Sequence, residues 1–374
     1  MKIVFLLPGT DHRKGVLNGQ NIRDKVACSG TDTSVILIAE YLAEIGHDVT
    51  IVLDKTDKKP CNNVKYTDFT YSGIASEVDV VVATLWFADE SDTFLPFKQD
   101  YNGMPFKVNK TLVYWQHLPW LYGYNAILEY LNKNTQLNFQ LVSPSIWSQS
   151  LISGYMEDLE EKIGSDRVSK RVIANPLVVD IFEEIEKETS NKITKKERST
   201  IFHSQGIRGG AVASRAIEEL RWEPIDFLCY LNDDGLGKKQ LYRKLLMADY
   251  FVFPVYNVGN KSVLQDTFCC AVAEAMAAGV ITITYPLGGV KEHFGDGCVF
   301  LPFPIEADVQ KFANNSAVGD ATYMDYTGNI KNVLLLLESN PILKNNIRDK
   351  AKQIARYRFD YRTIGREWNQ LLEV

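Results

Sequence analysis

Short hydrophobic runs alternate with amphipathic stretches along the first half of the chain. The runs that predict buried strands cover residues 2–7, 48–53, 78–83, 111–115 and 140–142. Between the first two runs, apolar residues recur at helical spacing over residues 31–45, and Gly46 follows where such a helix would end. Strands and helices in this order predict an α/β domain built on a parallel sheet.

The second half repeats this alternation after the polar segment 187–198, which we interpret as a solvated linker or the end of a surface helix. Strands are predicted at 200–203, 226–230, 249–254 and 280–284, and helices at 211–220, 239–247 and 269–278. The pattern from residue 330 to 374 is mostly helical, with an interruption near 357–361. These elements predict a second α/β domain.

The connection after the first predicted strand is unusually long. About twenty residues, with three glycines and several basic side chains, separate Leu7 from Gly30, whereas a strand-to-helix loop normally has only a few. We interpret this segment as a binding flap. It lacks a G-x-G-x-x-G pattern directly after the strand, which argues against a nicotinamide-dependent dehydrogenase.

The charge balance and the cysteines narrow the function classes. The 374 residues include 41 Lys and Arg against 47 Asp and Glu, a net charge of −6, whereas non-specific nucleic-acid binders are usually basic. The six cysteines lack paired zinc spacing, and adjacent Cys269 and Cys270 make a poor disulfide framework. Because no signal-peptide pattern follows Met1, we expect a cytoplasmic protein with reduced thiols and no nucleic-acid partner.

One stretch could be mistaken for a membrane span. Residues 267–286 carry a single charge, Glu274, over roughly the length that a bilayer requires. Gly279 falls where a helix would end and the β-branched run 280–284 follows it, so we predict a buried helix and then a buried strand. At most, we expect peripheral contact with a membrane.

Two acidic residues lie near the start of this predicted helix. A helix that begins near Phe268 presents free backbone N–H groups and the positive end of its dipole, which suits an anionic phosphate. Asp266 precedes the helix, and Glu274 lies about two turns along it among apolar residues, where a buried carboxylate needs partners such as ribose hydroxyls. The alternative is that Asp266 only caps the helix and Glu274 pairs with a nearby Lys or Arg.

Small and basic residues also follow two other predicted strands of the same domain. The strand 200–203 is followed by a guanidinium that matches phosphate geometry, among the residues Ser204, Arg208, Gly209 and Gly210. The strand 280–284 is followed by Gly288, Gly289 and Glu292. Each glycine pair alone is equally consistent with a plain tight turn. Three loops at the strand ends of one domain, however, can converge on a single crevice.

These motifs resemble those of the retaining nucleotide-sugar glycosyltransferases of the GT4-type family (glycosyl transferases group 1). That family carries two acidic residues with seven positions between them, the second opening an E-A-M-A-x-G stretch, and then G-G-x-x-E. Asp266 and Glu274 occupy the acidic positions, and the later motif is matched by Gly288, Gly289 and Glu292. Two features depart from the family: its first acidic residue is usually Glu, and its Arg–Lys phosphate pair is reduced here to Arg208.

The resemblance covers most of the chain and implies a GT-B fold. This is an α/β arrangement of two facing Rossmann-like domains, each with a parallel sheet. Residues 1–180 would form an N-terminal acceptor-binding domain, completed by a C-terminal helix at 359–374 that crosses back to it. Residues 181–358 would form the C-terminal domain that binds the nucleotide-sugar.

The resemblance also implies roles for individual residues. Those implied in catalysis are His117, Arg208, Asp266 and Glu274. Those implied in donor binding are Gly30, Thr31, Ser204, Gly209, Thr267, Phe268, Cys269, Gly288, Gly289 and Glu292. Three aromatic residues could stack on sugar rings in an acceptor cleft or could equally pack in the core. They are Trp115, Trp120 and Tyr122. Without the family, His117 reads as a structural histidine.

By this resemblance the protein transfers a sugar, with retention, from a UDP-, GDP- or ADP-type donor to a hydroxyl of a glycan, glycoconjugate or other acceptor. Arg208 and helix N-termini would stabilise the leaving diphosphate. No Asp-x-Asp triplet occurs in the chain, so we expect no metal and no further cofactor. The alternatives are a nucleotide-sugar epimerase and a non-catalytic two-domain protein that binds a sugar or nucleotide. The sequence leaves the oligomeric state open.

Overall fold

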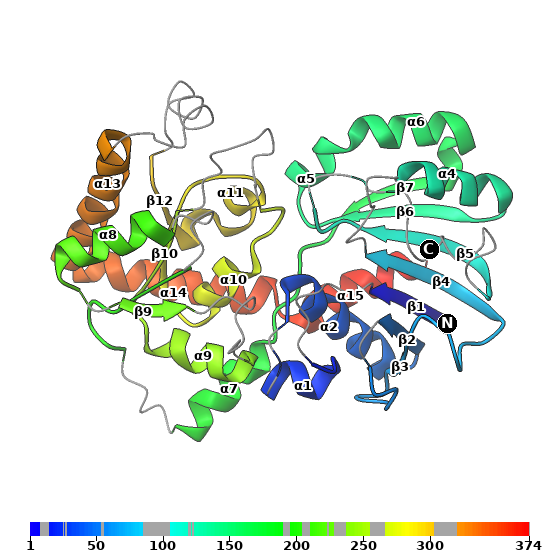
Figure 1. The fold of residues 1–374 in the computed structure, drawn as a ribbon, viewed down its shortest axis with the longest axis horizontal. Coiled ribbons are helices and arrows are strands. Elements are labelled where there is room, and N and C mark those ends of the chain that lie inside the picture. The colour runs from blue at the N-terminus through cyan, green and yellow to red at the C-terminus, as the bar shows by residue number, and fades with distance from the viewer. Residues whose placement is uncertain are drawn as a thin grey trace. The chain divides into compact units, whose positions relative to one another are not determined.

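The computed structural model describes residues 1–7, 15–24, 26, 28–53, 56–84, 105–118, 121, 123–189, 195–203, 210–222, 224–227, 237–254, 266–302 and 320–373. The chain forms two compact units. Unit 1 contains Met1–Leu177 and Asp360–Val374, and unit 2 contains Val178–Phe359. In Figure 1 the chain is coloured from blue at the N-terminus to red at the C-terminus.

Unit 1 is built on a parallel sheet of seven strands in the order β3-β2-β1-β4-β5-β6-β7. The strands are β1 (Lys2–Leu7), β2 (Asp48–Leu53), β3 (Lys65–Thr67), β4 (Glu77–Thr84), β5 (Lys107–Trp115), β6 (Asn138–Ser143) and β7 (Val168–Val172). In this register, Phe5 lies opposite Ile51 on one side and Val82 on the other. The strand order reverses between β1 and β4, which is the topological switch point of the sheet.

Alternate residues of β1 enter two different cores, because successive side chains of a strand point to opposite faces. Phe5 packs in the core under α2 (Gly30–Glu44) and α15 (Tyr361–Leu372), and Leu6 packs in the core under α4 (Tyr124–Lys133) and α6 (Ser153–Ile163). Figure 1 shows these two pairs of helices on opposite sides of the sheet. The shorter helices of the unit are α1 (Gly19–Asp24), α5 (Ile146–Leu151) and a 3-10 turn, Ser165–Arg167.

The C-terminal helix belongs to unit 1, as the family resemblance implies. Leu177 and Asp360 form a parallel bridge where the chain leaves and re-enters the unit, and the Tyr361 N–H donates to the Leu177 carbonyl at 3.2 Å. Helix α15 then packs on α2. There Gly365 approaches Tyr41 so closely that a Cβ atom would lie 2.3 Å from the ring, so this crossing depends on the missing side chain.

Unit 2 is built on a five-stranded parallel sheet in the order β12-β11-β10-β8-β9. Its strands are β8 (Thr200–His203), β9 (Pro224–Phe227), β10 (Tyr250–Phe253), β11 (Ile281–Thr284) and β12 (Cys298–Phe300). Its helices are α7 (Val179–Glu188), α8 (Gly210–Leu220), α9 (Lys238–Met247), α10 (Cys270–Ala277), α11 (Gly289–Phe294), α13 (Asp320–Ser339) and α14 (Pro341–Arg358), with a 3-10 turn at Gly295–Gly297. One face packs on α8 and α13, and α10 and α14 lie against the strands from the other.

The predicted α/β class with two parallel sheets is confirmed. Strands β1, β2 and β8 have their predicted bounds. Three strands were not predicted: β3 and β12 have three residues each, and β7, with the sequence VSKRV, is largely polar, so none shows the pattern of a buried strand. The stretch 267–286 contains α10 and β11. Among the described residues, no helix has the length and apolarity that a membrane crossing requires.

Candidate functional site

Topology locates the candidate site at the carboxyl edge of the unit 2 sheet. In an open parallel sheet, ligands bind outside the carboxyl ends of the strands where the strand order reverses, and in unit 2 this point lies between β8 and β10. After β8 come three predicted site residues that lie outside the described residues, namely the catalytic Arg208 and the donor-binding Ser204 and Gly209. The loop after β10 returns to the described residues at Asp266.

Two of the predicted motifs meet at this edge. The Gly289 N–H donates to the backbone carbonyl of Asp266 at 3.0 Å, which joins the segment before α10 to the start of α11. Gly288, the residue before α11, has φ 56° and ψ −136°, a conformation that is open to glycine and strained for other residues. The structure therefore brings Asp266 and the Gly288–Gly289 pair together. Glu292 lies exposed on α11.

Helix α10 begins at a strained residue. Cys269 is its N-cap and has the left-handed values φ 69° and ψ 77°, which an L-residue with a Cβ atom rarely adopts. Its side chain makes no capping hydrogen bond, and the first turn of α10 contains no acidic residue. Asp266 is therefore not the N-cap, contrary to the capping alternative. Strain of this kind clusters at ligand sites, because it aims backbone groups at the ligand.

The side chain of Phe268 points into the interior of unit 2. Its ring is buried and makes edge-on contacts with His293, Phe294 and Phe359, with ring centroids 5.0 to 5.4 Å apart. The neighbouring Thr267 is buried as well. For Phe268 this packing leaves the backbone as the part that could contact a donor, so its aromatic side chain acts as an anchor for the segment before α10.

Glu274 lies in the middle of α10 and is buried in an ion pair. Its Oε1 atom lies 2.5 Å from Nζ of Lys238, and the Tyr242 hydroxyl donates to the same oxygen at 3.1 Å. The side chains of Glu274 and Lys238 are only 6% and 8% exposed. The alternative in which Glu274 pairs with a basic residue is thus present in the structure, although it uses one of the two carboxylate oxygens.

Sequence reasoning missed Lys238 and Tyr242. They lie one turn apart on α9, so both reach α10 from the same face of their helix. Tyr242 is fully buried and its ring stacks on Phe182 of α7, with centroids 4.0 Å apart. One signal could have identified Lys238: it opens a helix, where the helix dipole disfavours a cation, so a compensating carboxylate was to be expected nearby.

Two basic side chains, Arg356 and Lys195, cap the far end of α10. Arg356 donates from Nε to the Ala277 carbonyl at 2.8 Å, and Lys195 donates from Nζ to the Ala278 carbonyl at 3.3 Å. Burial lowers the pKa of Lys195 to about 7. Glu186 holds the Arg356 guanidinium through both of its oxygens, at 2.8 and 3.0 Å. The negative end of the α10 dipole is thus compensated within unit 2.

The start of α2 in unit 1 is organised differently. Ser29 accepts a hydrogen bond from the Asp32 N–H at 3.0 Å, and the Asp32 carboxylate accepts one from the Ser29 N–H at 3.1 Å. This capping box places a buried carboxylate beside Gly30 and Thr31. Asp32 thus compensates the positive helix end beside Gly30 and Thr31, whose predicted role in donor binding stays a prediction.

His117 follows the carboxyl end of β5 in unit 1. Its ring lies 4.8 Å from the Trp115 ring, centroid to centroid, and burial lowers its pKa to about 3. The imidazole is therefore neutral near pH 7 and is no proton donor of the imidazolium kind. Beside it, Gln116 is fully buried: its amide nitrogen donates to the Ser148 carbonyl at 3.0 Å and its oxygen accepts from Ser143 at 2.7 Å.

Of the three aromatic residues predicted for the acceptor cleft, the structure describes only Trp115. Trp115 is fully buried in the core of unit 1 and contacts Trp368, with ring centroids 4.5 Å apart. A fully buried indole offers no face to a sugar ring, so its geometry favours the core-packing alternative. Trp120 and Tyr122 lie outside the described residues.

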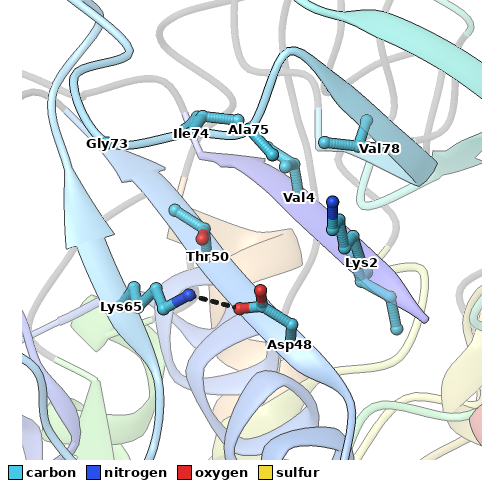
Figure 2. Close-up of a pocket in the computed structure, with 10 residues that line it drawn as sticks. Lys2, Val4, Asp48, Thr50, Lys65, Gly73, Ile74, Ala75 and Val78 are labelled. Carbon is cyan, nitrogen blue, oxygen red and sulfur yellow. Dashed lines mark hydrogen bonds and ion pairs between the residues drawn. The ribbon is translucent and has the colours of Figure 1, made fainter.

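A cavity of about 220 Å³ lies in unit 1 at the amino ends of the strands, opposite the carboxyl ends where His117 lies. Figure 2 shows its lining at the amino ends of the strands, with Lys2 of β1 and with Asp48 of β2 paired to Lys65 of β3 at 2.7 Å. None of the predicted site residues lines this cavity. Within the described ranges, no group of three or more His, Cys, Asp or Glu side chains is arranged to hold a metal ion.

The two strand orders, the helix that returns to unit 1 and the strand-end site of unit 2 define a GT-B glycosyltransferase fold. Sucrose-phosphate synthase from Thermosynechococcus elongatus matches with a TM-score of 0.64 at 10% identity, over 100% of this chain and 98% of that chain. HepE from Anabaena, in complex with UDP and glucose, matches with a TM-score of 0.59 at 13% identity, over 100% and 99%.

WaaG, a glycosyltransferase involved in lipopolysaccharide biosynthesis, matches with a TM-score of 0.53 at 12% identity, over 99% of each chain. No protein-family model matches the sequence, and no curated protein matches it significantly. The likeness at these low identities is one of fold.

Proposed function

We propose that the protein is a retaining glycosyltransferase of the GT4 type. It would move a sugar from a nucleoside-diphosphate sugar to a hydroxyl of a glycan or glycoconjugate, without a metal ion. The observation that supports this most directly is the hydrogen bond from Gly289 to the Asp266 carbonyl, because it joins two motifs of that family at the carboxyl edge of one sheet. HepE, which has the same fold, binds UDP-glucose.

In this proposal unit 2 binds the donor. The backbone at Cys269 and at the Gly288–Gly289 turn, together with Arg208, would hold the diphosphate, since amides at helix starts suit anions. Glu274 would accept a hydrogen bond from the ribose, and Asp266 would contact the sugar. Unit 1 would bind the acceptor, with the neutral His117 beside the reacting hydroxyl.

The chemistry asks mainly for positioning and for stabilisation of the leaving charge. The bond from the anomeric carbon to the diphosphate oxygen breaks, and the acceptor oxygen forms a bond to the same face of that carbon. The acceptor proton passes to the departing diphosphate, which takes both electrons of the broken bond. A neutral His117 could orient the hydroxyl, but the diphosphate is the base.

A nucleotide-sugar panel tests this proposal. Thermal shift first identifies which of the UDP-, GDP- and ADP-sugars bind, and release of free nucleoside diphosphate is then followed with and without candidate acceptors. Release that depends on an acceptor supports transfer. An epimerase would interconvert the sugars without this release, and a binding protein would leave them unchanged.

Two variants assign the roles of residues in that assay. We expect Glu274→Gln and Arg208→Ala each to lower the transfer rate at least about tenfold, or ~1.4 kcal/mol of transition-state stabilisation. Glu183→Gln is the matched control, because Glu183 is an exposed glutamate of the same unit that faces solvent on α7. Wild-type rates in both site variants would exclude the proposed site.

A further inference from the structure

Lys238 occupies an unfavourable place for a lysine. It is the first residue of α9, where the positive helix end repels a cation, and only 8% of its side chain is exposed, so its ammonium is largely removed from water. A buried ammonium is tolerated when a carboxylate pairs with it. The partner is Glu274, which lies 36 residues further along the chain on α10.

The pair fixes the orientation of the Glu274 carboxylate. Lys238 and Tyr242 both donate to Oε1, and Tyr242 is itself held by its stack on Phe182. Contacts among three helices, α7, α9 and α10, therefore hold the Glu274 carboxylate in one orientation. In the part of the chain that the structure describes, Oε2 of Glu274 accepts no hydrogen bond. One oxygen is thus committed to the protein and the other is left for a different donor.

We propose that Lys238, with Tyr242, is a positioning residue for Glu274 and makes the site selective for a ribose over a 2′-deoxyribose. This inference rests on the proposed function, in which Glu274 faces the nucleoside. With Oε1 occupied, the carboxylate meets the sugar through Oε2 alone, as an acceptor for a hydroxyl. A site that leaves such an acceptor unpaired rejects the analogue that lacks the hydroxyl.

A purely structural pair would behave differently. If Lys238 only ties α9 to α10, its loss lowers stability and weakens every ligand of the unit by a similar factor. If it positions Glu274, its loss changes the ratio between ligands that differ by one hydroxyl. The ratio of the two dissociation constants therefore separates the two roles.

Isothermal titration calorimetry measures that ratio with UDP, GDP and ADP against dUDP, dGDP and dADP. We expect the wild-type protein to bind at least one ribonucleotide at least about tenfold more tightly than its deoxy counterpart. In Lys238→Met and in Glu274→Gln the ratio should fall to about twofold or less. Lys238→Arg keeps a cation at the position and should restore most of the selectivity.

Lys239→Met is the matched control. Lys239 adjoins Lys238 in the same turn and is also ion-paired, but with the exposed Glu184 and Glu188 of α7, at 2.6 and 2.8 Å. Its loss should leave the ratio unchanged. Should Lys238→Met fail to fold, Tyr242→Phe removes one hydrogen bond to Oε1 and keeps the ring stack, and we expect it to lower the ratio about threefold.

The outcomes are distinct. If the wild-type protein binds none of the six nucleotides, the proposed function fails, and the inference fails with it. If it binds them with a ratio near one, the proposed function stands and the inference is wrong. Selectivity that survives in Lys238→Met, or in Tyr242→Phe where the former does not fold, while Glu274→Gln abolishes it, also overturns the inference.

Discussion

In unit 1, helix α2 begins with a cap made by its own side chains, whereas in unit 2 helix α10 begins at a left-handed cysteine. The start of α2 pairs Ser29 with Asp32 in two reciprocal hydrogen bonds and includes a buried carboxylate. The start of α10 has no acidic residue, and Cys269 makes no side-chain cap. The positive end of α2 is compensated by the Asp32 carboxylate in its own first turn, whereas the first turn of α10 contains no carboxylate.

The same contrast extends along the two sheet edges. In unit 1, after β5, His117 is neutral and the Gln116 amide is hydrogen-bonded to Ser148 and Ser143. In unit 2 the edge combines the strained Cys269 and a turn at Gly288 that only glycine adopts readily with the buried charges of Glu274 and Lys238. Strain and buried charge reduce stability unless something else requires them. The comparison therefore favours unit 2 as the donor-binding side in the proposed function.

The largest expected effect on nucleotide affinity comes from a substitution at Cys269 that disfavours its left-handed backbone conformation. Cys269→Val places a β-branched residue at φ 69°, which costs on the order of 1–3 kcal/mol and displaces the amides of the first turn. We expect the dissociation constants for UDP, GDP and ADP to rise at least about tenfold. Isothermal titration calorimetry measures the change for whichever nucleotide binds the wild-type protein.

Two control variants accompany that measurement. Cys269→Gly relieves the strain at the same position, so it should keep wild-type affinity. Gly30→Ala alters the start of α2 within helical backbone and should change the dissociation constants less than about twofold. A larger loss in Gly30→Ala than in Cys269→Val would reverse the comparison and return the phosphate site to unit 1.

The sequence predicts the strands that are buried on both faces, and the reason is physical. Strands such as β1 and β2 read as continuous hydrophobic runs because helices cover both sides of the sheet. Short strands such as β3 and the polar β7 carry no such signal, since three residues or an alternation with Lys and Arg do not exceed the background of a loop.

The sequence predicted the motifs of the candidate site but not the side chains that contact them. Asp266 and Gly289 meet because they follow adjacent parallel strands, β10 and β11, and that adjacency is implied by the alternation of elements. The position of Lys238 at a helix start signals that it needs a carboxylate nearby, but only the packing of α9 on α10 selects Glu274 as that carboxylate. The burial of Trp115 depends likewise on Trp368, which comes from the far end of the chain.

The next expected effect is a pH dependence of stability, which tests whether His117 of unit 1 is neutral in the folded protein. The pKa of His117 lies near 3 in the folded protein, whereas an unfolded histidine titrates near 6.5. The unfolded state thus binds a proton first as the pH falls, so stability is complete above pH 6.5 and declines below it. From pH 6.5 to 5.5 the loss due to His117 is about 1 kcal/mol.

Urea denaturation of the wild-type protein and of His117→Gln measures this difference. Glutamine does not titrate, so the variant should lack that part of the pH dependence while sharing the rest. Equal slopes in the two proteins would mean that the pKa of His117 is the same in the folded and unfolded states, so that it becomes an imidazolium in the folded protein below about pH 6.5. An imidazolium at this edge would make unit 1 the more cationic side and weaken the contrast with unit 2.

The smallest expected effect concerns the cap of α2. Ser29→Ala removes the side-chain oxygen that accepts the Asp32 N–H, so the free energy of unfolding should fall by about 1 kcal/mol. Nucleotide affinity should change less than about twofold, because the Asp32 carboxylate still lies at the helix start and still disfavours an anion. A variant of unchanged stability with affinity reduced tenfold or more would show that Ser29 contacts the ligand. In that case the hydrogen bonds within α2 would be a resting arrangement that the ligand displaces, and the start of α2 would itself contribute to nucleotide binding.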